Sequence, residues 1–75
     1  MDDKSTANMA VLAGEIMLRS GAETYRVEDT IKHILDTAGT AETESLVMLT
    51  GIIVTIDRPG EGAVTVMRRV HDRGS

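Results

Sequence analysis

The spacing of the apolar residues changes at Gly39, and this change constrains the fold more than any other feature of the sequence. Before Gly39 the apolar side chains recur three or four residues apart, which is the period of an amphipathic helix. After it, short runs rich in Val, Ile and Thr are separated by glycines, which is typical of β-strands. The sequence therefore predicts an α+β chain with its helices first and its strands last.

We predict a first helix over about residues 8–20. The apolar face of that helix contains Met9, Leu12, Ala13, Ile16 and Met17. Ser5, Thr6 or Asn8 can cap its first turn, because a side-chain oxygen there can accept a hydrogen bond from a free backbone amide. Gly21 is expected to end the helix, since glycine readily takes the left-handed conformation.

A second helix is predicted over about residues 23–38. Its apolar stripe contains Val27, Ile31, Ile34, Leu35 and Ala38. Glu23 and Thr24 suit its first turn as capping residues, and Gly39 fits the position where a helix ends. Two helices joined by so short a connection are expected to pack antiparallel or at a steep angle.

Three strands are predicted after the helices, over about residues 45–49, 52–57 and 63–70. A tight turn at Thr50-Gly51 would make the first two a hairpin, whereas a bulge at Gly51 would make them one kinked strand. Pro59-Gly60 predicts a turn before the last strand, because Pro fixes φ at the first central position and Gly supplies a positive φ at the second.

Both faces of the predicted sheet carry apolar residues. In the first two strands the even and the odd positions are both apolar, so each face of the sheet needs a cover. We therefore expect two helices packed on one face of a small antiparallel three-stranded sheet, in the order ααβββ. The other face would meet another subunit, another domain or a segment outside this sequence. We expect a homo-oligomer that forms through the sheet.

Arg68 interrupts an apolar face of the last strand. The other even positions of that strand are Val64, Val66 and Val70. Three arrangements stay open: the strand ends near Met67, a bulge changes its register, or Arg68 enters a half-buried place and needs an acidic partner. Glu28 or Asp29 could supply that acid.

The connection between the helices gathers charged side chains beside Tyr25, the only aromatic residue. Together with one arginine of the last strand they form a candidate interaction or structural corner, whose members are Glu23, Arg26, Glu28, Asp29 and Arg68. Glu15 and Arg19, four residues apart, are placed on the outer side of the first helix as a surface pair. Charges of this kind usually form a solvated helix face, so a structural role and a binding role both stay open.

Composition argues against several classes of function. The net charge of -4 and the pI of about 4.9 argue against a basic nucleic-acid-binding face. With no cysteine and two histidines the sequence offers no metal-ligand set, and we expect no metal and no cofactor. The longest uncharged stretch, residues 45–56, is much shorter than the roughly 20 apolar residues that a membrane-spanning helix needs. No serine lies in a nucleophile motif, so we assign no catalytic residue.

Several short motifs follow one another in a distinctive order. They are Gly14-Glu15, Gly21-Ala22-Glu23, Arg26-Val27-Glu28, Thr50-Gly51 and Arg68-Arg69-Val70. In this order, and over roughly residues 9–70, the sequence resembles the N-terminal soluble domain of threonine/serine exporter-like membrane proteins.

The resemblance implies a cytoplasmic domain that precedes the transmembrane helices of bacterial transporters for small hydroxylated amino acids. Those helices, and a soluble helix expected after the last strand, are absent from this sequence. We therefore expect residues 1–75 to be a single, incomplete domain that does not transport by itself. It would lie at the cytoplasmic face of the cell membrane, with a regulatory or assembly role, and its partner would be the transmembrane domain of the same or another protein.

Two alternatives from other functional classes stay open. One is a hydrolase-like module that uses Glu23, Glu28 or Asp29 as a base. The other is a plain dimerisation module with no ligand.

Overall fold

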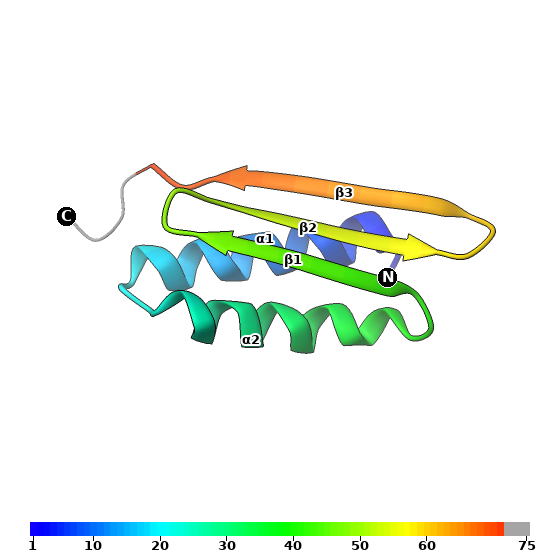
Figure 1. Cartoon of the computed structure of the whole chain (residues 1–75), viewed down its shortest axis with the longest axis horizontal. Helices are drawn as coiled ribbons and strands as arrows, with labels where there is room; N and C mark the ends of the chain where they lie inside the picture. The colour runs from blue at the N-terminus through cyan, green and yellow to red at the C-terminus, as the bar shows by residue number, and fades with distance from the viewer. Residues whose placement is uncertain (72–75) are drawn as a thin grey trace.

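Two helices lie against one face of a three-stranded antiparallel sheet (Figure 1). The computed structural model describes residues 1–71. In chain order the elements are α1 (Asp3–Arg19), α2 (Thr24–Leu35), the 3₁₀ helix η1 (Asp36–Ala38), β1 (Glu42–Met48), β2 (Gly51–Arg58) and β3 (Gly62–Arg69). The predicted α+β class and the order of two helices before three strands are confirmed.

Helix α1 begins several residues before its predicted start. Asp2 caps it: the Asp2 backbone is extended, and its carboxylate accepts a hydrogen bond from the Ser5 amide at 2.7 Å. Because the ionised carboxylate is the better acceptor, this bond lowers the pKa of Asp2. The predicted caps Ser5, Thr6 and Asn8 are wrong, since all of them lie within the helix.

The buried face of α1 is not the predicted one. Its buried residues are Thr6, Ala7, Ala10, Val11, Gly14 and Leu18. Met9, Leu12 and Ile16, from the predicted face, are instead 47%, 48% and 57% exposed. We call these three residues the α1 outer stripe. Ala13 and Met17, the other two members of the predicted face, are partly buried, and Met17 packs against the core. The helix therefore has apolar residues on two sides, and apolar spacing alone rotated the predicted face away from the buried one.

Gly14 explains why the small residues of α1 pack inward. A Cβ atom at this position would lie 2.7 Å from Cδ1 of Ile52 and 2.9 Å from Cδ1 of Ile31. The side chains of Ile52 and Ile31 thus lie directly against the helix at Gly14, and a larger residue there would have to displace them. Long side chains such as Leu12 remain on the outside of the helix.

Helix α2 packs with its predicted stripe toward the core. The members that are fully buried are Val27, Ile31 and Leu35, and those partly buried are Ile34 and Ala38. The chain continues into η1 and turns at Gly39, where φ is 74°. Glu23 occupies the N-cap position, but its side chain caps no amide, so that predicted role is wrong.

The strands form a sheet in the order β1-β2-β3. Met48 pairs with Gly51, so β1 and β2 form a hairpin, and the alternative of one bulged strand is wrong. The two turn residues are Leu49 and Thr50, one position before the predicted Thr50-Gly51, and Gly51 already belongs to β2. Glu42 pairs with Asp57, so β1 begins before its predicted start at residue 45. The start of β1 thus extends the sheet beyond the strand length that the apolar residues alone indicate.

The turn between β2 and β3 has the predicted geometry. Gly60 has φ 81°, and the Glu61 amide donates to the Arg58 carbonyl at 2.9 Å across Pro59 and Gly60. Proline and glycine therefore occupy the two central positions of a turn whose second position requires a positive φ.

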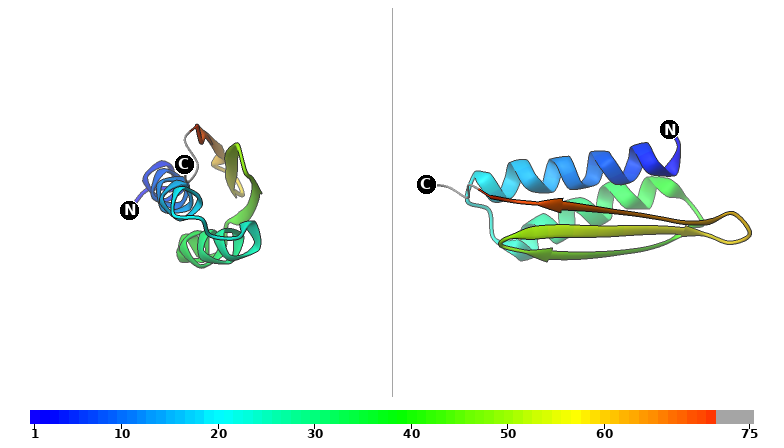
Figure 2. Two further views of the ribbon diagram at one scale, coloured as in Figure 1. Left: turned by 90° about the vertical axis from the view of Figure 1, so that its left-hand side faces the viewer. Right: turned by 90° about the horizontal axis from the view of Figure 1, so that it is seen from above.

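Helix α1 lies over β2 and β3, whereas α2 lies over β1 (Figure 2). The inner face of the sheet, which contacts the helices, is closed: Ile52, Val54 and Ile56 are fully buried. The opposite face is called the outer face below. The molecule is elongated, 43 × 18 × 18 Å. The α1–α2 connection, the β1–β2 hairpin and the end of β3 lie at one end, called the Thr50 end, and the N-terminus and the β2–β3 turn lie at the other (Figure 1).

Candidate functional site

The connection between α1 and α2 is closed by backbone hydrogen bonds. Gly21 has φ 89°, and its amide donates to the Leu18 carbonyl at 3.0 Å. The Ala22 amide donates to the Met17 carbonyl at the same distance. These two bonds satisfy carbonyls that the end of a helix would otherwise leave free. The predicted role of Gly21 is confirmed.

The charged residues beside this turn lie exposed on the start of α2. They are Glu23, Arg26, Glu28 and Asp29. Among residues 1–71 the contact of these side chains with another titratable group is that of Asp29 Oδ2, 3.9 Å from His33 Nδ1, and the same nitrogen lies 2.8 Å from the Asp29 carbonyl oxygen. Arg68 does not join them, because it lies on β3 and pairs with another acid. An interaction role for these four charges stays a prediction.

Glu23, Glu28 and Asp29, the candidate bases of the hydrolase alternative, have no nucleophile hydrogen-bonded to them among the described residues. The side-chain hydroxyl hydrogen bonds among residues 1–71 involve other groups, such as backbone carbonyls of the helices and the Thr55–Thr65 pair. Covalent catalysis needs a nucleophile within reach of its base. No such arrangement surrounds Glu23, Glu28 or Asp29 in the described part of the chain.

Glu15 joins the first helix to the last strand. Its Oε1 accepts a hydrogen bond from Arg68 Nη1 at 2.9 Å, and its Oε2 accepts one from Arg19 Nε at 3.0 Å. The bond from Arg19 is the main cause that lowers the pKa of the Glu15 carboxyl, Arg68 lowers it further, and partial desolvation opposes both. We call these three residues the Glu15 cluster.

Of the three arrangements left open for Arg68, the structure shows the half-buried arginine with an acidic partner, and that partner is Glu15 rather than Glu28 or Asp29. A strand end near Met67 and a bulge in β3 are both wrong, since β3 continues to Arg69 in regular register with β2. The partner was missed because the wrong face of α1 was assigned to the core. With the small residues turned inward, Glu15 lies at the side of α1 that borders β3.

Arg58 forms a comparable link at the other end of the molecule. Its Nε and Nη2 donate to Oδ2 and Oδ1 of Asp3 at 3.0 and 2.9 Å, and Nη2 also donates to the Ala38 carbonyl at 2.7 Å. This bidentate pair of hydrogen bonds lowers the pKa of the Asp3 carboxyl and raises the pKa of the Arg58 guanidinium. The end of β2 is thereby tied to the start of α1 and to η1.

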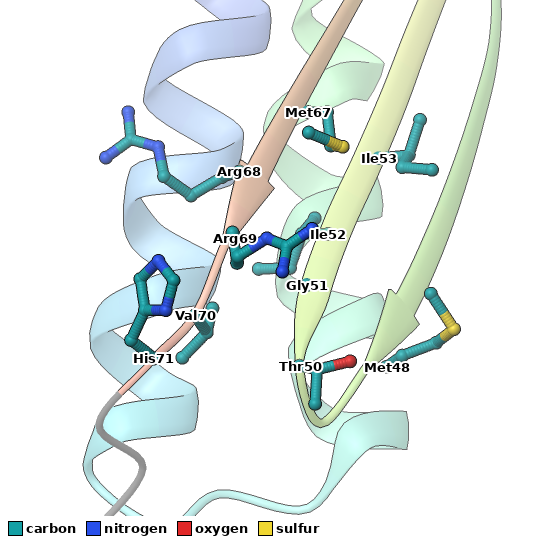
Figure 3. Close-up of a pocket in the computed structure, with 10 residues that line it drawn as sticks. All are labelled: Met48, Thr50, Gly51, Ile52, Ile53, Met67, Arg68, Arg69, Val70 and His71. Atoms are coloured by element: carbon teal, nitrogen blue, oxygen red, sulfur yellow. The ribbon is translucent and has the colours of Figure 1, made fainter.

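The outer face of the sheet exposes an apolar row near the Thr50 end. Leu46, Ile53 and Met67 are paired side by side on the three strands. Leu46 and Met67 are 50% and 64% exposed, and Ile53 is partly exposed. Together with Met48 from the adjoining row they form what we call the outer apolar patch, of which Figure 3 shows Met48, Ile53 and Met67. Exposed apolar patches of this kind mark interaction surfaces.

A shallow hollow of about 350 Å³ opens beside the patch, around Gly51 (Figure 3). In this row Met48 and Arg69 flank Gly51 on the neighbouring strands. Glycine has no side chain to fill the space between them. Figure 3 shows the Arg69 side chain extending over β2 near Gly51, whereas the Arg68 side chain points away toward α1.

The remaining half of the outer face is polar. Its two rows contain Glu44, Thr55 and Thr65, and then Glu42, Asp57 and Ala63. The hydroxyls of Thr55 and Thr65 lie 3.0 Å apart. The expectation of a sheet that is apolar on both faces therefore holds only for the half near Thr50. The face has acids at one end and Arg69 at the other.

Within residues 1–71 no three His, Asp or Glu side chains come close enough to hold a metal ion. In the same part of the chain no helix combines the length and apolar character needed to cross a membrane.

Comparison with known proteins gives one match. The sequence model of a family described as "Putative threonine/serine exporter" matches residues 8–75. No curated protein matches the chain, and no solved structure matches it. The matched range includes most of α1, all the other elements, the Glu15 cluster and the outer apolar patch.

Proposed function

Because the chain belongs to the threonine/serine exporter family, we propose that it is a soluble cytoplasmic domain with a regulatory or assembly role in such an exporter. The chain does not itself form the path of the solute. It offers surfaces on which the exporter assembles or is controlled. It acts at the cytoplasmic face of the cell membrane, beside transmembrane helices supplied by the same protein or by a partner.

The exposed apolar surface is the observation that carries this proposal. The outer apolar patch and the α1 outer stripe leave large apolar side chains exposed on both layers of one small domain. Contiguous apolar surface on a soluble protein usually belongs to a contact with another molecule. The domain already has a closed core between its helices and its sheet, so these residues are not needed for that core.

The charged residues support a contact role rather than catalysis. The carboxylates of Glu15 and Asp3 accept hydrogen bonds from Arg68 and Arg58, which connect the strands to α1. Glu23, Glu28 and Asp29 are exposed. Among residues 1–71 none of their carboxylates is hydrogen-bonded to a side-chain hydroxyl group. No observation therefore favours the hydrolase alternative.

Reconstitution tests the proposal. The transmembrane part of a threonine/serine exporter is inserted into lipid vesicles with its cytoplasmic side outward, and labelled threonine and the chain are added outside. We expect the chain to co-sediment with these vesicles but not with empty ones. We also expect it to change the initial rate at which threonine enters the vesicles.

Two variants identify the surface that is used. Met67→Lys places a charge in the outer apolar patch, and Leu12→Lys places one in the α1 outer stripe. At least one of them should release the chain from the vesicles, while both remain folded by circular dichroism. An unchanged rate and no co-sedimentation up to about 100 µM, which corresponds to a binding free energy weaker than roughly 5.5 kcal/mol, would overturn the proposal.

A further inference from the structure

We propose that two copies of this chain pack face to face through the outer faces of their sheets, with their strands antiparallel. The apolar row Leu46–Ile53–Met67 of one copy then meets the same row of the other. Arg69 of each copy lies over the acidic half of its partner's sheet. This inference goes beyond an exporter role and does not depend on it, because it concerns only two copies of the purified chain.

The apolar row provides the centre of such an interface. Its three residues occupy matching positions on adjacent strands, so they form a continuous band across the whole width of the sheet. A two-fold axis that runs along this band places each row on itself, which is the geometry of an isologous dimer. Sheets that pack face to face interdigitate such side chains over about 10 Å.

The distribution of charge selects the orientation of the second copy. Glu42, Glu44 and Asp57 lie on the outer face on one side of the apolar row, and Arg69 lies on the other side. Parallel strands would place the acids of one copy opposite the acids of the other. Antiparallel strands place Glu44 opposite Met48 and Arg69 opposite Thr65, so no acid of one copy faces an acid of the other. Because like charges across an interface are unfavourable, the antiparallel arrangement is preferred.

The hollow around Gly51 fits the same arrangement. With the axis on the apolar row, the row Met48–Gly51–Arg69 faces the partner's row Glu44–Thr55–Thr65. Gly51 is then opposite Thr55 of the second copy, so the residue without a side chain faces one of moderate size. A space that is empty in one copy thus has a side chain available to fill it in the other.

The size of the face predicts a weak dimer. The three outer rows that face the second copy span about six residues at about 3.3 Å per residue on strands about 4.8 Å apart, which is roughly 290 Å² per copy. A stable complex usually buries about 800 Å² per partner. We therefore expect a dissociation constant between roughly 10 µM and 1 mM, rather than in the nanomolar range.

The first experiment is sedimentation equilibrium of the purified chain from about 10 µM to 1 mM, the range set by the expected affinity. Wild type should change from monomer to dimer within this range. Met67→Lys and Leu46→Lys should stay monomeric throughout, because each buries a charge at the centre of the interface. Ile16→Lys is the matched control: it places the same charge in the α1 outer stripe and should dimerise like wild type.

Three results would overturn the proposal. One is a folded wild-type monomer at every concentration. Another is a dimer that Ile16→Lys abolishes and Met67→Lys does not, since the interface would then lie on α1. The third is a dimer that both sheet variants, Met67→Lys and Leu46→Lys, leave intact. Circular dichroism of each variant confirms that it is folded, which is expected because all three positions are exposed.

A charge introduced at Thr65 tests the orientation. In the antiparallel arrangement Thr65 lies opposite Arg69 of the second copy, so Thr65→Glu should tighten the dimer about fivefold, because two exposed ion pairs of about 0.5 kcal/mol each would form. Combining Thr65→Glu with Arg69→Gln should remove this gain. In a parallel arrangement Thr65→Glu would instead meet the acidic end of the second copy, so a dimer weakened by Thr65→Glu would contradict the antiparallel arrangement.

Discussion

The inner face of the sheet is closed by two helices and the outer face is open, although the same three strands supply both. Ile52 and Ile53 are neighbours on β2, yet Ile52 is fully buried and Ile53 is not. Arg68 and Arg69 are neighbours on β3, yet only Arg68 forms an ion pair with another element among residues 1–71. Adjacent residues of one type therefore have different surroundings because successive side chains point to opposite faces.

The difference shows that apolar content alone does not decide which surface is buried. On the inner side a helix with small residues approaches closely, and each charge that enters is paired. On the outer side a comparable apolar row remains in water. Close approach of a complementary element, rather than hydrophobicity by itself, distinguishes the two faces.

The largest expected effect comes from truncating the two neighbouring isoleucines. Ile52→Ala should lower the free energy of unfolding by about 2–5 kcal/mol, because it removes a fully buried side chain and leaves a cavity. Ile53→Ala should lower it by about 1 kcal/mol or less, since that side chain is partly in water. Urea denaturation followed by circular dichroism measures both.

A milder substitution keeps this comparison measurable if Ile52→Ala does not fold. Ile52→Val should cost about 0.5–1.5 kcal/mol, and Ile53→Val should cost clearly less. If the two substitutions lowered the free energy of unfolding equally, the outer face would be as well covered in solution as the inner face.

A smaller effect is expected at the close approach of α1. Gly14→Val should lower the free energy of unfolding by about 1–3 kcal/mol, because its branched side chain overlaps Ile31 and Ile52. Gly14→Ala should be tolerated better, since it displaces only the ends of those side chains and gains up to about 1 kcal/mol of helix propensity. Asn8→Val, on the exposed side of α1, is the control. Gly14→Val as stable as this control would exclude the close approach.

The smallest expected effect concerns the charge on the inner face. The folded-state pKa of Glu15 is lowered, so its contribution to stability is fully present above the unfolded value of about 4.5 and is lost as the pH falls through the folded value. Wild type should therefore exceed Glu15→Gln in urea midpoint at pH 7, and the difference should shrink toward pH 3. Arg69→Gln removes a charge from the outer face and should lower the midpoint less than Arg68→Gln does. A difference between wild type and Glu15→Gln that is constant with pH would contradict the Glu15 cluster.

Local patterns in the sequence were sufficient for much of the fold. The period of α2, the turn at Pro59-Gly60 and the helix end at Gly21 each depend on residues close together in the chain. For the same reason the order of helices and strands could be predicted. The start of β1 could not, because Glu42 is in the strand through its pairing with Asp57, and its own type does not favour a strand.

The orientation of α1 could not be predicted from apolar spacing. Its larger apolar side chains, such as Leu12, form a regular stripe, whereas the buried face consists mostly of small residues. Only the closeness of Ile52 to Gly14 shows that small residues are required inward, and this is a contact between distant parts of the chain. The wrong orientation of α1 also led to the wrong candidate partners for Arg68, because that partner lies on the side of α1 that faces β3.

The placement of Met1 and of the end of β3 at opposite ends of the molecule has a practical consequence for labelling. Met1 lies at the end of the molecule remote from Thr50, whereas β3 leads the chain out at the Thr50 end (Figure 1). His71 lines the hollow around Gly51, so a label placed at this residue lies beside the outer apolar patch. A tag at the N-terminus leaves the outer apolar patch free. A fluorophore near His71 should instead report directly on whatever covers the patch.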